Sequence, residues 1–191
     1  MKSWLRSFNI YFYLLAALAV VSGGCSSSGL SMRKEYSTLR VYMEGAPRES
    51  PMVYVTRART LMYIKPEPIL TEEDVQKATL ADNPDGTFEI QVTFNDHGSL
   101  VLDMQTTSNR GKHLIIFSHF PPKGWKEPKD SGTDSAEPPK PGEPRISGWL
   151  AAPLIQTGFS NGSLKFTPDA SHEEADRIVR GLNNMARDLA K

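Results

Sequence analysis

The stretch Thr87–Phe117, with the sequence TFEIQVTFNDHGSLVLDMQTTSNRGKHLIIF, carries the signals of a strand, a helix and a second strand in succession. Apolar side chains alternate with polar ones from Phe88 to Phe94, which predicts a strand with one buried face. The run Leu114–Phe117 is continuously apolar, as expected of a central strand covered on both faces. We therefore expect the fold to be built around this strand–helix–strand unit.

A helix is expected between these two strands, from Asn95 or Asp96 to about Ser108. A side-chain oxygen at either starting position can accept hydrogen bonds from the free backbone N–H groups of the first turn. Gly111 tolerates the positive φ at which many helices end.

Three further strands are expected before this unit. In the first, Leu39, Val41 and Met43 alternate with polar or aromatic residues. The other two are 52–56 and 61–64, joined by a hairpin or a bulge. Several methionine and tyrosine side chains stand at strand or helix spacing and are expected in the core: Met52, Tyr54, Met62, Tyr63 and Met104.

A short helix is expected after Thr71, whose hydroxyl can form a capping box with Asp74. Leu70 and Val75 flank this start as a hydrophobic staple, and Ala78 would continue the buried face.

The stretch 121–144 contains seven prolines, and Trp125 is its only large apolar side chain. Such a composition cannot bury enough apolar surface to offset the entropy of ordering, so we expect a disordered excursion from a hairpin tip. A strand should follow at 146–151, and Asn161-Gly162 predicts a tight hairpin or a hairpin-like turn.

The last helix is expected to begin at Ser171, with Glu174 at the capping-box position. Its apolar residues recur at helical spacing and form one stripe: Ala175, Ile178, Val179, Leu182, Ala186 and Leu189. Arg177 and Arg180 are expected to lie away from this stripe.

Residues 1–24 are typical of an export signal, with a basic start and a short apolar run, Ile10–Val21. This run is too short to span a bilayer comfortably. Small residues then lead to Cys25, the single cysteine of the chain. We therefore expect a lipoprotein signal peptide with Cys25 as the lipidated residue. The alternative is an ordinary secretory signal with an incidental cysteine.

Residues 25–36 would then form a flexible lipid-anchored tether, and 37–191 the folded domain. Removal of Lys2 and Arg6 leaves 20 of 22 basic residues beside 22 acidic ones, a formal charge of 20 − 22, or −2. This balance gives no basic surface for nucleic acid. Ser26 after the cysteine favours the outer over the inner membrane of a bacterial envelope, with the domain in the periplasm.

The order of elements predicts an α+β fold in which a small mixed or antiparallel sheet carries two to three helices on one face. The spacing of Gly98, Thr106-Thr107, Asn109 and Gly111-Lys112 before an apolar strand resembles the head of the first periplasmic domain of SecD, an accessory subunit of the bacterial preprotein translocase. Further parts of the chain resemble the same domain, over about 54–183: Ile69–Val75, Ala152-Pro153, Glu173–Ala175 and Leu182.

Two departures from that family stand out. The family has a tight turn where this chain has 121–144, and it carries membrane helices that this chain lacks after Val21. The chain therefore resembles a stand-alone head domain held by lipid. Because the family's head is thought to contact exported polypeptides, the resemblance implies binding of such polypeptides or of translocase subunits.

The polar residues show no pattern of a catalytic, metal or cofactor site. The four histidines, His97, His113, His119 and His172, lack the short spacing of metal ligands. Glu72-Glu73 and Glu173-Glu174 fall in first turns of helices, where negative charge complements the helix dipole. Thr106, Thr107 and Asn109 are expected to hydrogen-bond the end of their helix. We expect no enzyme, no metal, no cofactor and no small-molecule substrate.

Trp149 and Phe159 are the candidate binding residues. On an uncovered sheet face they would form an apolar patch suited to capture of a polypeptide in a groove or at a strand edge. We therefore expect a non-catalytic extracytoplasmic lipoprotein that binds exported polypeptide or export machinery. The alternative is a structural envelope lipoprotein that reuses the fold without a transport role.

Overall fold

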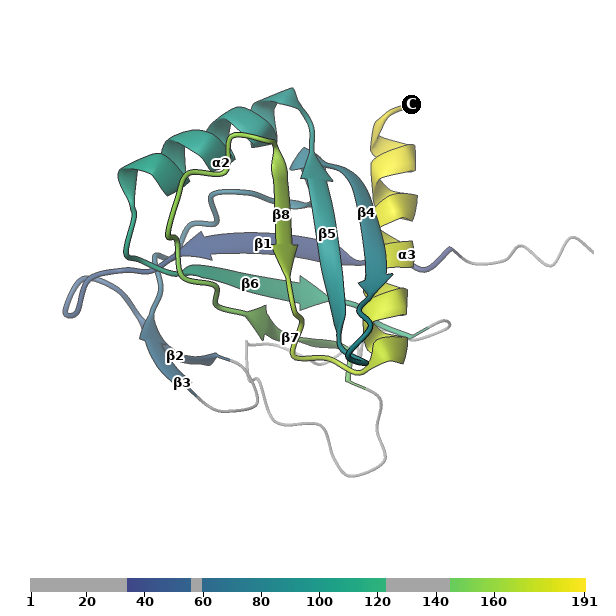
Figure 1. The fold of residues 1–191 in the computed structure, drawn as a ribbon, viewed down its shortest axis with the longest axis horizontal. Helices are drawn as coiled ribbons and strands as arrows, with labels where there is room; N and C mark the ends of the chain where they lie inside the picture. The colour runs from purple at the N-terminus through teal and green to yellow at the C-terminus, as the bar shows by residue number, and fades with distance from the viewer. Residues whose placement is uncertain (1–33, 56–59, 123–144) are drawn as a thin grey trace, which may run out of the picture. The chain divides into compact units, whose positions relative to one another are not determined.

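The computed structural model describes residues 34–55, 60–122 and 145–191 (Figure 1). The elements in chain order are β1 (Thr38–Met43), β2 (Met52–Val55), β3 (Thr60–Tyr63), the 3-10 helix η1 (Glu72–Asp74), β4 (Val75–Asp82), β5 (Phe88–Phe94), α2 (Asp96–Ser108), β6 (Leu114–His119), β7 (Ser147–Ala151), β8 (Ser163–Phe166) and α3 (His172–Leu189). Among these residues, no helix is both long and apolar enough to cross a bilayer.

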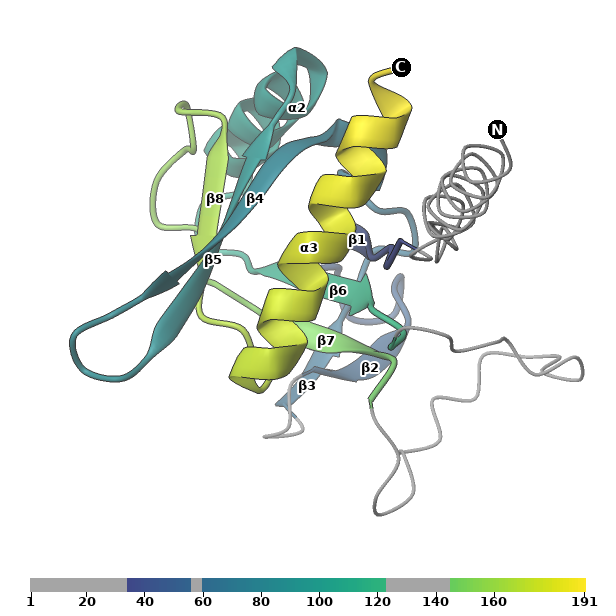
Figure 2. The ribbon, with the colours of Figure 1, turned by 90° about the vertical axis from the view of Figure 1, so that its right-hand side faces the viewer.

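The strands form three antiparallel sheets. The β6 sheet has the order β1-β6-β7, the β5 sheet has the order β4-β5-β8, and β2 pairs only with β3. The strands of the two larger sheets cross one another (Figure 1), and the sheets form two layers with α3 along one side (Figure 2). The α+β class is confirmed, although the single expected sheet is divided into three.

The main core lies between the two larger sheets and the helices. It is built by the alternate residues of each strand, among them Val41 on β1, Val92 on β5 and Leu164 on β8, all fully buried. Leu102 closes the core from α2, and Ile178 does so from α3. Burial of the apolar faces of α2 and α3 against the sheets, more than helix propensity, stabilises helices of this length.

Strand β6 is buried on both sides, as its apolar run predicts. Leu114 and Ile116 belong to the main core, whereas Ile115 faces the other way into a second cluster. The hairpin β2–β3 supplies Val55 and Met62 to that second cluster. The hairpin therefore covers the outer face of the β6 sheet.

The helix expected after Thr71 is present only as the 3-10 turn η1, and its expected continuation through Val75 and Ala78 is wrong. The capping box between Thr71 and Asp74 is present, but only one 3-10 turn follows it before β4 begins at Val75. A register shift between Val75 and Lys77 inserts an extra residue into β4. Two residues three positions apart, Val75 and Ala78, therefore both become buried, which imitates the spacing of a helix.

Three expectations about the core are also wrong. Met104 and Met52 are 59% and 52% exposed, and on α2 the core is reached by Leu102 instead. Leu189 is 54% exposed because the last turn of α3 extends beyond the sheets. Met62 is buried as expected, Tyr63 is half-buried, and the side chain of Tyr54 lies outside what the structure describes.

Arg177 is buried, although we expected it to lie on the exposed side of α3. Its guanidinium approaches two backbone carbonyls, those of Phe120 and Arg145, at 3.4 Å each. Carbonyl partners of this kind reduce the cost of burying the charge.

The turn at Asn161-Gly162 is confirmed, with Gly162 at φ +64. It does not close a hairpin, because β8 pairs with β5 and not with the residues before the turn. The expected signal peptide, Cys25, Trp125 and the stretch 123–144 lie outside the described residues.

Candidate functional site

The outer edge of β8 is the candidate functional site. The Phe94 N–H donates to the Gly162 carbonyl at 2.9 Å, which makes Phe94 and Gly162 a hydrogen-bonded pair. From this pair onward, hydrogen-bonded and non-hydrogen-bonded pairs alternate along the β5–β8 register. Hydrogen-bonded residues alternate in an antiparallel pair, so the backbone groups of Leu164 point at β5 and those of Ser163 and Lys165 point away from it. The Ser163 N–H donates to Asn161 Oδ1 at 3.2 Å. The Ser163 carbonyl and both backbone groups of Lys165 have no hydrogen-bond partner among the described residues.

Both edges of the β6 sheet have backbone groups that are already occupied. On the β1 side, the Val41 N–H donates to the Leu70 carbonyl at 2.9 Å and the Ile69 N–H donates to the Val41 carbonyl at 2.8 Å. On the β7 side, the Leu150 carbonyl accepts from the Asp169 N–H at 2.6 Å. An additional strand therefore finds occupied backbone groups on both sides of this sheet.

The β4 edge of the β5 sheet is occupied by a side chain from α3. The Asn183 carboxamide accepts from the Ala78 N–H at 2.9 Å and donates to the Ala78 carbonyl at 2.8 Å. One amide side chain thus satisfies both outward backbone groups of Ala78, as a paired strand would. Among the described residues, each of the other three edges of the two larger sheets thus has outward backbone groups that are occupied by another segment or by a side chain, whereas at the β8 edge the only such partner is the Asn161 side chain on the Ser163 N–H.

Sequence reasoning found the turn at Asn161-Gly162, just before β8, but missed the open edge. The partner of β8 is β5, about 70 positions earlier in the chain, and no local pattern shows this pairing. One signal was available: Lys165 is an exposed lysine in the middle of a short strand, a common device for protecting edge strands.

The structure does not bring Trp149 and Phe159 together. Trp149 is half-buried on β7 and lies edge-on to Tyr42 and Phe117, with ring centroids 5.7 and 5.0 Å away. Phe159 is half-buried against the main core, and its N–H donates to Thr106 Oγ1 at 3.0 Å. Phe159 stands four positions before β8, whereas Trp149 belongs to the cluster under the hairpin.

Three of the histidines pair with a carboxylate from another element. His97 contacts Asp74 at 2.7 Å, and His172 contacts Asp82 at 3.0 Å. His113 contacts Glu44 at 2.8 Å. In the described parts of the chain, no three histidine, cysteine or acidic side chains gather closely enough to hold a metal ion.

The other polar groups singled out from the sequence serve the helices. Glu174 completes the capping box of α3 by accepting from the Ser171 N–H at 2.7 Å. The Thr106 hydroxyl donates to the Leu102 carbonyl at 2.7 Å. The Asn109 amide donates to the Gln105 carbonyl at 2.9 Å. These contacts confirm structural roles for Thr106 and Asn109 at the end of α2.

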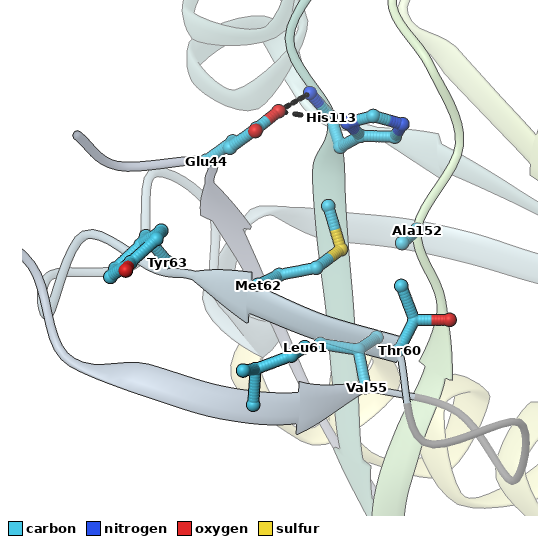
Figure 3. Close-up of a pocket in the computed structure, with 8 residues that line it drawn as sticks. All are labelled: Glu44, Val55, Thr60, Leu61, Met62, Tyr63, His113 and Ala152. Atoms are coloured by element: carbon cyan, nitrogen blue, oxygen red, sulfur yellow. Dashed lines mark hydrogen bonds and ion pairs between the residues drawn. The ribbon is translucent and has the colours of Figure 1, made fainter. Parts of the chain in front are cut away.

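A pocket of about 460 Å³ lies between the hairpin and the start of β6 (Figure 3). Met62 lines its apolar side, and Glu44 and His113 form its polar side. Glu44 Oε2 accepts from both the backbone N–H and the ring Nδ1 of His113, each at 2.8 Å. This pair joins the residue before β6 to the residue after β1.

The Glu44 contact predicts a dependence of stability on pH. Burial raises the pKa of Glu44, but the hydrogen bonds from the side chain and backbone of His113 outweigh it, so the net pKa lies below its ordinary value of 4.5. The carboxylate therefore contributes stability above pH 4.5, and this contribution is lost as the pH falls through the lowered pKa. Urea unfolding at pH 7 and at pH 3 should show the wild type losing more stability on acidification than Glu44→Gln does. An equal loss in both proteins would contradict the assignment.

Neither a protein-family model nor a curated protein sequence matches this chain. Its fold, however, matches solved structures of SecDF. A crystal structure of SecDF in a super-membrane-facing form has a TM-score of 0.50 at 19% identity, over 81% of this chain and 20% of the SecDF chain. A structure of SecDF described as a membrane component that enhances protein export has a TM-score of 0.50 at 17% identity, over 84% of this chain and 70% of that one. A further SecDF structure, from Thermus thermophilus, has a TM-score of 0.42 at 19% identity, over 79% of this chain and 20% of that one.

The chain thus spans about a fifth of the first SecDF chain and has the fold of its periplasmic domain. This confirms the SecD-head-like fold expected from the spacing around Gly98 and Gly111.

Proposed function

We propose that this chain is a non-catalytic, lipid-anchored protein of the bacterial cell envelope that binds extended polypeptide segments during export. The free edge of β8 is the observation that carries this proposal. A polypeptide in transit exposes unpaired backbone N–H and C=O groups. Strand addition satisfies such groups regardless of their side chains, which suits a binder of many sequences.

The size of the edge predicts weak and reversible binding. Three backbone groups of Ser163 and Lys165 have no partner among the described residues: the Ser163 carbonyl, the Lys165 N–H and the Lys165 carbonyl. A net contribution of about 1 kcal/mol per hydrogen bond would give only a transient complex unless side chains add to it. We include Phe159 in the site because it stands directly upstream of β8, and we retain Trp149 as a separate candidate on the β6 sheet.

The similarity to SecDF supports a role in transport at the level of the fold, because one SecDF structure is described as enhancing protein export. The anchor is proposed to be Cys25, with residues 26–33 as the link to the domain in the periplasm. Ser26, the residue after Cys25, favours attachment to the outer membrane over the inner membrane.

Lys165→Pro should abolish polypeptide binding while preserving the fold. Proline removes the Lys165 N–H, which points to the open edge and takes no part in the β5–β8 ladder, so the sheet can retain its pairing. Lys165→Thr is the matched control, because it removes the charge and keeps the N–H. Binding is measured as adducts of a photoreactive residue at Thr167 in the tagged full-length chain in cells.

We expect adducts with polypeptides in export or with translocase subunits for the parent and Lys165→Thr, and none for Lys165→Pro. A photoreactive residue at Lys77 reports the background, because Lys77 is exposed on the same sheet beside the edge that Asn183 occupies. Adducts that form only with structural envelope proteins would overturn the transport role in favour of a structural lipoprotein.

A further inference from the structure

The outer edge of β8 is short, and contacts within the chain bound it at both ends. At its start, the Ser163 N–H is occupied by Asn161 Oδ1. Beyond its end, the Asp169 N–H donates to a carbonyl of β7 at 2.6 Å. Between these two contacts, backbone groups point away from β5 at three positions, Ser163, Lys165 and Thr167. Lys165 is therefore the central residue of the edge.

The side chain of Lys165 points to the exposed face of the β5 sheet. Its neighbours along the strand, Leu164 and Phe166, are buried in the main core, and side chains alternate along a strand. The residue opposite Lys165 on β5 is Gln91, whose amide donates to the hydroxyl of Ser163 at 3.1 Å. The Lys165 ammonium makes no ion pair or hydrogen bond with any residue that the structure describes. Its positive charge is therefore available to a strand that adds on the outer side of β8.

One register of an added antiparallel strand uses this edge most fully. In a hydrogen-bonded pair, two opposite residues exchange both of their backbone hydrogen bonds. Ser163 offers only its carbonyl, because Asn161 holds its N–H, whereas Lys165 offers both groups. The central residue of the added strand, called X here, therefore lies opposite Lys165. The Cα atoms of such a pair are about 5.5 Å apart and their side chains share a face, so the side chain of X lies beside that of Lys165.

We infer that the β8 edge selects extended polypeptide segments with an aspartate or glutamate opposite Lys165 and an apolar residue on each side of it. Opposite charges across two strands stabilise the pairing, and like charges destabilise it. The residues before and after X point to the other side of the sheet, where Leu164 and Phe166 are buried and Phe159 packs against the main core. This inference rests on the proposed binding at β8 and adds the class of segment that binds there.

The test measures adducts between the full-length chain and synthetic peptides. The chain is isolated from membranes in detergent and carries a photoreactive residue in place of Thr167, which is exposed at the end of β8. Each peptide has the sequence Val-Thr-Val-X-Val-Thr-Val, where X is glutamate, glutamine or lysine. Acetylated and amidated ends leave X as the only position where the charge differs. Mass spectrometry quantifies the adducts over a range of peptide concentrations, which gives an apparent Kd for each peptide.

At low ionic strength, we expect the glutamate peptide to bind about three-fold more tightly than the glutamine peptide and about ten-fold more tightly than the lysine peptide. Added salt should reduce both ratios, because exposed charge pairs are screened. Lys165→Thr keeps the backbone groups of the edge and should bind the three peptides equally. Lys165→Glu should reverse the order of the glutamate and lysine peptides. Both variants should keep the fold, because the Lys165 side chain is exposed.

The outcomes distinguish failure of the charge preference from failure of polypeptide binding. Equal apparent Kd values for the three peptides in the parent chain would overturn this inference and leave binding at β8 intact. A preference for glutamate that persists in Lys165→Thr would also overturn it, because another residue would then carry the preference. If no peptide gives more adducts at Thr167 than at a photoreactive residue replacing Lys77, the proposed binding at β8 is overturned and this inference with it.

Discussion

Phe120→Ala should lower the free energy of unfolding by about 3–5 kcal/mol, the range observed when a phenylalanine ring is removed from a packed core. Among the residues that the structure describes, Phe120 is the largest side chain that is completely buried. Its ring belongs to the main core, and the guanidinium of Arg145 lies 5.5 Å from the ring centroid. Truncation would therefore leave a cavity and also remove a partner of a positive charge.

Urea unfolding followed by circular dichroism measures this effect, with Leu100→Ala as the matched control. Leu100 is also a large apolar residue, but it is 60% exposed on α2, so its truncation should change stability by less than about 1 kcal/mol. Equal losses for the two variants would show that Phe120 does not occupy the core position described above.

Phe120 also takes part in the contacts between the residues just before and just after the stretch 121–144. Its N–H donates to the Ile146 carbonyl at 2.6 Å, and its carbonyl accepts from Arg177. The same Arg177 nitrogen approaches the carbonyl of Arg145. One buried guanidinium thus connects the last residues before the proline-rich stretch with the first residues after it. Long insertions cost little stability when their two ends are held together in this way.

The unit Phe88–Phe117 could be predicted from the sequence because its signals are local. Asn95 accepts from the Gly98 N–H at 2.8 Å as the expected cap, and Gly111 has φ +82 where the chain leaves α2. Each feature depends on residues within one or two turns. The same holds for the capping box of Ser171 with Glu174.

The features that the sequence could not show depend on contacts between residues that are far apart in the chain. The bulge gives the buried residues of β4 the spacing of a helix, and only the pairing of β4 with β5 shows that the segment is a strand. The edge of β8 is open because no described strand pairs with its outer side, and the edge of β4 is occupied at Ala78 by Asn183, which stands 105 positions later in the chain. Burial of Arg177 likewise follows from carbonyls 57 and 32 positions earlier.

Gly181→Ala should lower the free energy of unfolding by about 1–3 kcal/mol, although alanine is the better helix former. Gly181 lies in α3 where the helix meets Ser37, just before β1. A Cβ at this position would lie 2.7 Å from Ser37 Cβ and 2.5 Å from the Ser37 backbone nitrogen, and it would collide with the Ser37 hydroxyl. The segment leading into β1 would have to move away from α3.

The sign of this effect is diagnostic. On an open helix surface, glycine to alanine stabilises by about 1 kcal/mol, so a stabilised variant would contradict the close approach. Ser37→Gly in the same chain separates the two parts of the clash. It removes the Ser37 hydroxyl and Cβ but leaves the backbone nitrogen, so the double variant should recover only part of the lost stability. Full recovery would show that the side chain alone sets the distance between α3 and the chain that enters β1.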